Sequence, residues 1–191
     1  MKANFSENER QFLLELARRA IESAVCGTTS PSIEENLSPI LLKPHGAFVT
    51  LREASELRGC IGYIEPTNSL AETVKEVAVK AALEDTRFMP VSPEEMQHIE
   101  IEISVLSPLM QIHNVQEIEV GLHGLIIETG RYRGLLLPQV ASGYGWDRET
   151  FLNQTCRKAG LPMNAWQYPD VKIYTFTAEI FSEHSSSHAN S

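Results

Sequence analysis

The chain has 191 residues, of which 42% are hydrophobic and 21% charged, a composition that supplies a core for one folded domain and excludes global disorder. Its 25 acidic residues outnumber its 16 Lys and Arg and give a formal charge of −9, so we expect no nucleic-acid partner. It contains no apolar run of about 20 residues and begins without an apolar signal segment, which predicts a cytoplasmic protein without a membrane span.

The first predicted element is an amphipathic helix. Ser6 and Glu9 have the spacing of a capping box, in which each side chain bonds the backbone N–H of the other residue. Apolar residues then recur at helical spacing as far as Gly27, which is typical of a helix end. Prolines and small polar residues in 28–44 predict an irregular connector.

A β-hairpin follows the connector. Residues 47–52 and 57–65 are rich in β-forming types, and the short segment 53–56 between them suits a hairpin turn. Because side chains alternate across a strand, we expect Arg58 and Cys60 to share one face at a backbone separation of about 7 Å.

A second capping box, Ser69 with Glu72, predicts another helix. Its Val and Ala residues between 74 and 82 form a narrow stripe, which would let the helix lie close against a sheet. Ser92, followed by proline and two glutamates, predicts a short third helix.

The second half of the chain alternates strands and turns. Residues 98–106 alternate apolar and polar side chains, which predicts a strand with one buried face. Residues 125–128 and 134–137 are expected to pair as a hairpin. A helix is expected between Asp147, as its N-cap, and Gly160.

The pattern as a whole predicts an α+β fold. A final strand of β-branched and aromatic residues is expected at 171–181, and residues 184–191 form a polar tail. Hairpin-connected strands interleaved with helices predict a largely antiparallel sheet flanked by helices, in one domain over residues 1–183.

Cys60 carries the strongest chemical signal. It lies between Gly59 and Gly62 and two residues after Arg58, and a nearby guanidinium lowers the pKa of a thiol towards the reactive thiolate. The glycines would leave open volume and backbone N–H groups for a substrate oxygen. In the alternative interpretation Cys60 is a small buried hydrophobic residue.

The other cysteines have no comparable surroundings. Cys26 and Cys156 are interpreted as buried structural residues, and three widely spaced cysteines without a C-x-x-C pair predict free thiols in a reducing compartment. His45, Cys60 and His123 are suitable metal ligands, but their spacing follows no compact metal-binding template, so we expect no metal.

Four further polar residues are candidates for the same site. Asp85 and Arg87 either hold each other in place or grip a polar ligand through the guanidinium. His123 lies in a tight turn, where it acts as an acid, base or ligand, or is simply tolerated. Gln139 follows Pro138, which ends a strand. Its amide either helps to orient a polar substrate or caps the end of the sheet.

Residues 57–62, Leu-Arg-Gly-Cys-Ile-Gly, resemble the signature hexapeptide of the AMMECR1 domain family, also called AmmeMemoRadiSam system protein A. Other segments resemble the family's pattern in the same order, and together they cover nearly the whole chain from the first helix to Phe181. These segments are residues 48–51, 85–90, 121–124, 133–140, 145–147 and 158–161.

The resemblance implies an α+β fold with a larger and a smaller lobe around an antiparallel sheet, and a cleft near the signature segment. It implies no settled activity. Members of the family often occur beside, or fused to, Memo-like proteins and radical SAM proteins, which implies a shared modification pathway. This chain has no CxxxCxxC motif, so radical chemistry would belong to a partner and we expect no cofactor here. It departs from the family in the hairpin turn, where Ala54 and Ser55 replace a more usual glycine.

Two functions fit these residues. In the first, Cys60 is a nucleophile or covalent carrier for a small polar substrate, and it should react with iodoacetamide faster than Cys26 and Cys156. In the second, the cleft is a binding module that presents a peptide or small ligand to a Memo-like or radical SAM partner. The expected catalytic residues are Cys60, Arg58, His123 and Asp85, and the expected substrate-binding residues are Gly59, Gly62, Arg87 and Gln139.

Overall fold

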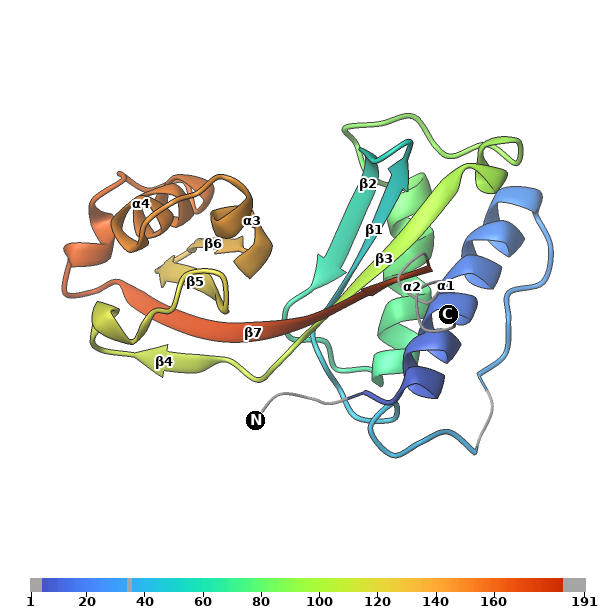
Figure 1. Cartoon of the computed structure of the whole chain (residues 1–191), viewed down its shortest axis with the longest axis horizontal. Helices are drawn as coiled ribbons and strands as arrows, with labels where there is room; N and C mark the ends of the chain where they lie inside the picture. Colours follow the sequence, from blue (N-terminus) through green and yellow to red (C-terminus); the bar gives the residue numbers. More distant parts are fainter. Residues whose placement is uncertain (1–4, 34–35, 184–191) are drawn as a thin grey trace, which may run out of the picture. The chain divides into compact units, whose positions relative to one another are not determined.

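A computed structural model describes residues 5–33 and 36–183 of the chain. Strands of one antiparallel sheet alternate with helices, so the predicted α+β class is confirmed (Figure 1). The described residues divide into two compact units, which we call the larger unit (5–106 with 179–183) and the smaller unit (107–178). The predicted tail at 184–191 lies outside the described residues.

The larger unit contains three strands and two long helices. Strand β1 pairs antiparallel with both β2 and β3, so β2 lies at the edge of the sheet. Both predicted capping boxes are present, at Ser6 with Glu9 and at Ser69 with Glu72. The elements are α1 (Glu7–Cys26), β1 (Ala47–Glu53), β2 (Glu56–Tyr63), α2 (Leu70–Leu83), the 3-10 turn η1 (Glu95–Gln97) and β3 (Ile99–Leu106).

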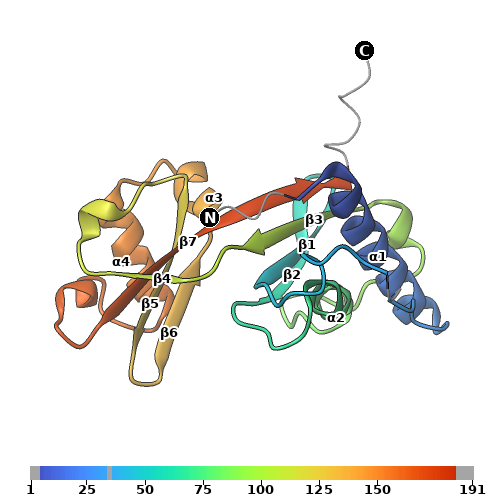
Figure 2. The same cartoon turned by 90° about the horizontal axis from the view of Figure 1, so that it is seen from below.

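The core of the larger unit lies between the sheet and the two helices. Figure 2 shows α1 and α2 on the same side of β1, β2 and β3. Val49, Leu51, Ile101 and Ile103 point to this side and are completely buried. Because side chains alternate along a strand, the residues between them point to the opposite face, which is polar.

The β1–β2 hairpin contains two irregularities. Ala54 and Ser55, which form its turn, both have positive φ, at 48° and 69°, as in the two-residue turns that match strand twist. The register shifts between Leu51, which pairs with Gly59, and the next residue, which pairs with Leu57. Residue 58 is therefore the extra residue of a β-bulge, a feature that re-aims the side chain it carries.

The smaller unit is built on the long strand β7, which also pairs with the short strand β4. Strand β5 pairs with β6 and β7, and helices cover a core that includes Leu125, Ile127 and Phe151. The elements are β4 (Met110–Ile112), η2 (Val115–Glu117), β5 (His123–Thr129), β6 (Tyr132–Leu136), α3 (Pro138–Gly143), α4 (Arg148–Lys158), η3 (Ala165–Gln167) and β7 (Lys172–Ser182), whose last residues from 179 belong to the larger unit.

The structure differs from the sequence prediction at three elements. The expected third helix is a single 3-10 turn, and β4 and α3 were not predicted. Pro138 is the first residue of α3, where its fixed φ and missing N–H cost nothing, so it begins a helix as well as following a strand. Within the described segments, none of the helices combines the length and the apolar character needed to cross a bilayer.

Candidate functional site

Cys60 lies in the middle of β2 on the face of the sheet that points away from the helices. It pairs with Thr50 of β1, whose hydroxyl donates a hydrogen bond to Sγ over 3.3 Å. Cys60 itself is partly buried, whereas Cys26 is exposed and Cys156 is buried. The interpretation of Cys26 as buried is therefore wrong, because the last turn of α1 is open to solvent.

The backbone of Cys60 is held by two side chains from the segment that follows α2. Its N–H donates to Asp85 Oδ2 over 2.9 Å, and its carbonyl accepts from Arg87 Nη2 over 3.3 Å. Backbone groups on the outer side of an edge strand have no strand to pair with, so Asp85 and Arg87 satisfy them in place of a neighbouring strand.

Asp85 and Arg87 also bind each other closely. The Arg87 guanidinium donates to Asp85 through Nε over 2.9 Å and through Nη2 over 2.6 Å. Asp85 is buried, and these bonds from Arg87 hold the pKa of its carboxyl well below the usual range. Of the two roles considered for this pair, the geometry therefore favours pinning the loop to the sheet edge.

Arg58 is not directed at the Cys60 thiol. Its Nε donates to Glu95 Oε1 over 2.8 Å and its Nη2 to Oε2 over 3.2 Å, and its guanidinium lies 5.9 Å from the centre of the Phe88 ring. The bulge at residue 58 breaks the alternation on which the expected Arg58–Cys60 pairing depended. Arg58 thus lowers the pKa of Glu95 and has no comparable effect on Cys60.

The pKa of the Cys60 thiol is raised, contrary to the expectation of a ready thiolate. Burial is the main cause, because a desolvated sulfur disfavours the negative charge. The Thr50 hydroxyl and the charge of Arg87 oppose this shift, while the charges of Asp85 and Glu102 add to it. The thiol is therefore protonated at neutral pH.

The two glycines of the signature do not leave open volume. A Cβ atom at Gly59 would lie 2.2 Å from the carbonyl oxygen of Ala81 in α2, and one at Gly62 would lie 2.3 Å from the ring of Phe48. The expected substrate space is thus filled by a helix backbone and by an aromatic ring. These glycines permit close packing, which is a structural role.

The remaining two expected site residues, His123 and Gln139, belong to the smaller unit. His123 Nδ1 accepts a hydrogen bond from the Glu119 N–H over 3.0 Å, so the neutral ring carries its proton on Nε2. The ring borders a cavity of about 340 Å³ together with Met110 of β4, residues just before β4, and Phe176 and its neighbours in β7. Gln139 lies in the first turn of α3, and its buried Oε1 has no partner among the described residues.

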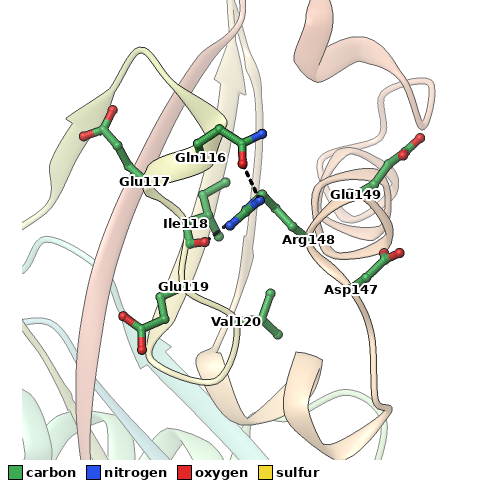
Figure 3. A pocket seen from close by; sticks show the side chains of 8 residues that line it. All are labelled: Gln116, Glu117, Ile118, Glu119, Val120, Asp147, Arg148 and Glu149. Atoms are coloured by element: carbon green, nitrogen blue, oxygen red, sulfur yellow. Dashed lines mark hydrogen bonds between the residues drawn. The ribbon is translucent and has the colours of Figure 1, made fainter.

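A larger cavity of the smaller unit, of about 670 Å³, was not predicted from the sequence (Figure 3). Arg148 lies at its centre, where Nε donates to the Ile118 carbonyl over 3.1 Å and Nη1 to Gln116 Oε1 over 2.7 Å. Four carboxylates belong to other residues that line the cavity, so its lining carries a net negative charge. They are those of Glu117, Glu119, Asp147 and Glu149.

The structure adds polar neighbours of Cys60 that were not considered as site residues. Thr50 and Glu102 lie next to each other on the same face as the thiol. The apolar–polar alternation within a strand identifies its exposed face. It does not identify the neighbouring strands, and it is the pairing of β1 with β2 and β3 that brings Thr50 and Glu102 next to Cys60. In the described part of the chain, no three His, Cys, Asp or Glu side chains gather closely enough to hold a metal ion.

The chain is similar to known proteins over nearly its whole length. The sequence model of a family described as AMMECR1 matches residues 14–181. A protein of Methanothermobacter thermautotrophicus is 43% identical, covering 95% of this chain and 97% of that protein, and protein TK0174 of Thermococcus kodakarensis is 46% identical, covering 91% and 89%. The crystal structure of protein PH0010 from Pyrococcus horikoshii matches with a TM-score of 0.85 at 44% identity, covering 90% of each chain.

Proposed function

Because this chain belongs to the AMMECR1 family, whose signature hexapeptide surrounds Cys60, we propose that it is a binding module. The polar face of the sheet around Cys60 recognises a small polar ligand or a peptide and presents it to a partner protein. The signature then serves to build this face rather than to activate a nucleophile.

One observation supports the proposal: the guanidinium groups that would stabilise a thiolate form ion pairs with carboxylates. Arg58 is bonded to Glu95 and Arg87 to Asp85, and burial raises the pKa of the Cys60 thiol. A protonated thiol is a weak nucleophile, because the thiolate is the reactive form. It is instead a small group with a weak S–H donor, which suits a recognition surface.

A second candidate is a thiol-based active site, and one contact favours it. The Thr50 hydroxyl donates to Sγ, and a hydrogen bond to the sulfur stabilises the thiolate once it forms. In this function Cys60 acts as the nucleophile, with Asp85 and Arg87 fixing its backbone.

The proposed partners are a Memo-like protein and a radical SAM protein. The frequent association of the family with both supports this choice. The absence of a CxxxCxxC motif from the sequence supports a division of labour in which the partner performs the radical chemistry.

Alkylation rates separate the two candidates. A binding module is expected to react with iodoacetamide at pH 7 in the order Cys26, Cys60, Cys156, which follows exposure. A Cys60 that reacts faster than Cys26 would favour the active site, as the sequence alone had suggested. Mass spectrometry of the three cysteine peptides measures the rates, and urea-unfolded protein gives the reference in which all three are equivalent.

The partner is tested by capture of a purified Memo-like protein on the immobilised full chain. We expect binding at micromolar concentration, and we expect the conservative variant Cys60→Ser to retain it, because a hydroxyl preserves a small polar group at this position. If Cys60→Ser binds the partner but abolishes the modification reaction of the complete system, this would instead indicate catalysis by the thiol.

A further inference from the structure

The polar face around Cys60 contains a row of neighbouring polar side chains from three strands. Thr50 of β1 lies between Cys60 of β2 and Glu102 of β3, since it pairs with both. Ser104 lies two residues further along β3, opposite Phe48, and points to the same face as Glu102. The row therefore places two hydroxyls, a thiol and a carboxylate side by side.

Two members of this row lack hydrogen-bond partners among the residues that the structure describes. Ser104 is only 1% exposed, and its hydroxyl has no partner. The Glu102 side chain is 22% exposed and accepts no hydrogen bond in the same residues; its nearest cation is Arg52, at 4.0 Å. Buried polar groups in native proteins are nearly always paired, so the Ser104 hydroxyl points to a ligand that supplies the missing donor. The partly exposed Glu102 carboxylate beside it can accept a hydrogen bond from the same ligand.

The aromatic ring next to the row is directed towards β2, on the other side of β1 from Ser104. Ring atoms of Phe48 lie within 2.4 Å of the position that a Cβ at Gly62 would occupy. The ring therefore leans over β2, away from Ser104 on β3. Gly62 is required for this arrangement, because any larger residue would push the ring back across β1.

The hydrogen-bonding capacity of the row defines the ligand. Thr50 uses its proton on Sγ, so its oxygen is left as an acceptor, and the Glu102 carboxylate only accepts. With the Ser104 oxygen, the row offers three acceptors and one negative charge. A primary ammonium group has three N–H donors and one positive charge, whereas an anion would be repelled by Glu102.

We infer that Thr50, Glu102 and Ser104 form a subsite for a primary ammonium group, carried by a free amine or by a lysine side chain of a peptide. The inference rests on the proposed function, since it identifies the chemical class of the ligand that the Cys60 face recognises.

The test is a titration of the ¹⁵N-labelled full chain followed by amide chemical shifts. The probes are methylammonium, a short peptide with one lysine, and two matched molecules without the ammonium group, acetamide and acetate. We expect saturable shifts at residues 50, 60, 102 and 104 with both ammonium probes. Tighter binding of the peptide than of methylammonium indicates that the source is a lysine side chain, and equal binding indicates a free amine.

Variants connect the shifts to the subsite. Glu102→Gln is expected to weaken binding of the ammonium probes roughly 10- to 100-fold, as for loss of a hydrogen bond to a charged group. Glu100→Gln is the matched control, because it removes the same charge from the same strand and face but lies opposite Arg52 instead of Thr50. It is expected to change the affinity for the ammonium probes by less than about threefold. Ser104→Ala should leave the melting temperature unchanged or raise it, because it removes a buried hydroxyl that has no partner among the described residues. Glu102→Gln should change it little, because Glu102 is partly exposed and its ion pair with Arg52 is long.

The outcomes distinguish the subsite from the wider proposal. If acetamide or acetate shifts these amides and the ammonium probes do not, the ammonium assignment is overturned and a ligand site at this face remains. If the ammonium probes bind Glu102→Gln as tightly as the parent chain, the subsite is overturned, and a ligand site elsewhere on this face remains. If none of the probes shifts these amides, the subsite is overturned, and partner capture alone decides the proposed function.

Discussion

The close approach of β2 to α2 at Gly59 is open to a direct test by the substitution Gly59→Ala. The added Cβ would lie 2.2 Å from the carbonyl oxygen of Ala81 and 3.2 Å from its carbonyl carbon. Both atoms belong to the backbone of α2, so no side-chain rotation relieves the overlap. Since close carbon–oxygen contacts in proteins begin at about 3.3 Å, strand and helix must separate by about 1 Å.

The loss of stability caused by this separation depends on how far the neighbouring side chains can adjust. Overpacking a core costs about 1–3 kcal/mol when side chains can adjust. Here the nearest side chain, that of Leu51, is itself completely buried, so we expect the upper end, about 3 kcal/mol. Gly143→Ala is the matched control, because nothing lies within 4 Å of its added Cβ and the residue is helical. It should be neutral or stabilising by about 0.5–1 kcal/mol.

Urea unfolding measures both variants. With a slope of about 2 kcal/mol per molar urea, Gly59→Ala should lower the midpoint of the circular dichroism transition by roughly 1.5 M. Trp146 and Trp166 both belong to the smaller unit, so their fluorescence reports on that unit separately. A midpoint for Gly59→Ala within about 0.3 M of the parent chain, at an unchanged slope, would refute the packing argument.

Three further predictions concern the hairpin turn, the sheet edge and the thiol. Ala54→Asn combined with Ser55→Gly places residues that tolerate positive φ in the turn and should raise stability by about 1 kcal/mol, seen as a higher melting temperature; an unchanged or lower value would contradict the turn geometry. Asp85→Asn should lower the free energy of unfolding by about 3 kcal/mol at pH 7. Because Arg87 lowers the pKa of Asp85, its contribution is present above the unfolded-state pKa of about 3.9 and is lost as the pH falls further. The difference between the two chains should therefore shrink below about pH 4, and a constant difference from pH 7 to pH 2 would contradict this. Burial raises the pKa of Cys60, so its alkylation rate should reach half-maximum at a higher pH than that of N-acetylcysteine; a half-maximum at a lower pH would show an activated thiol.

Local signals in the sequence were sufficient to predict the long helices. The capping boxes at Ser6 and Ser69 are both formed, and Gly27 ends α1 with a φ of 67°. Each of these signals lies within a few residues of the structure it determines. The hairpins and the buried face of β3 were predicted for the same reason, because alternation along one strand is enough to identify its two faces.

The candidate site was harder to predict because it depends on how strands pair. Period-two alternation placed Arg58 beside Cys60, but the bulge shifts the register within the same strand and directs Arg58 to Glu95. No local residue pattern announces that bulge. Glu102 was correctly placed on a polar face, yet its proximity to Cys60 follows only from the pairing of both strands with β1.

The secondary structure around Gln139 shows a different limit. Pro138 was taken as the end of a strand, and β6 does end just before it, at Leu136. The same proline is also favourable at the first position of a helix, and α3 uses it in that way. A segment of six residues is too short for helical periodicity to distinguish the two roles.

The larger unit is discontinuous in sequence, and this has a consequence for the order of events during synthesis. Phe181 belongs to its core, and Glu183 accepts hydrogen bonds from Arg18 and from the Ile101 N–H, over 2.7 Å and 2.9 Å. A ribosome must therefore translate all of residues 107–178 before the larger unit can complete its own core. The smaller unit, which is continuous, is free to fold first on the nascent chain, although it comes second in the sequence.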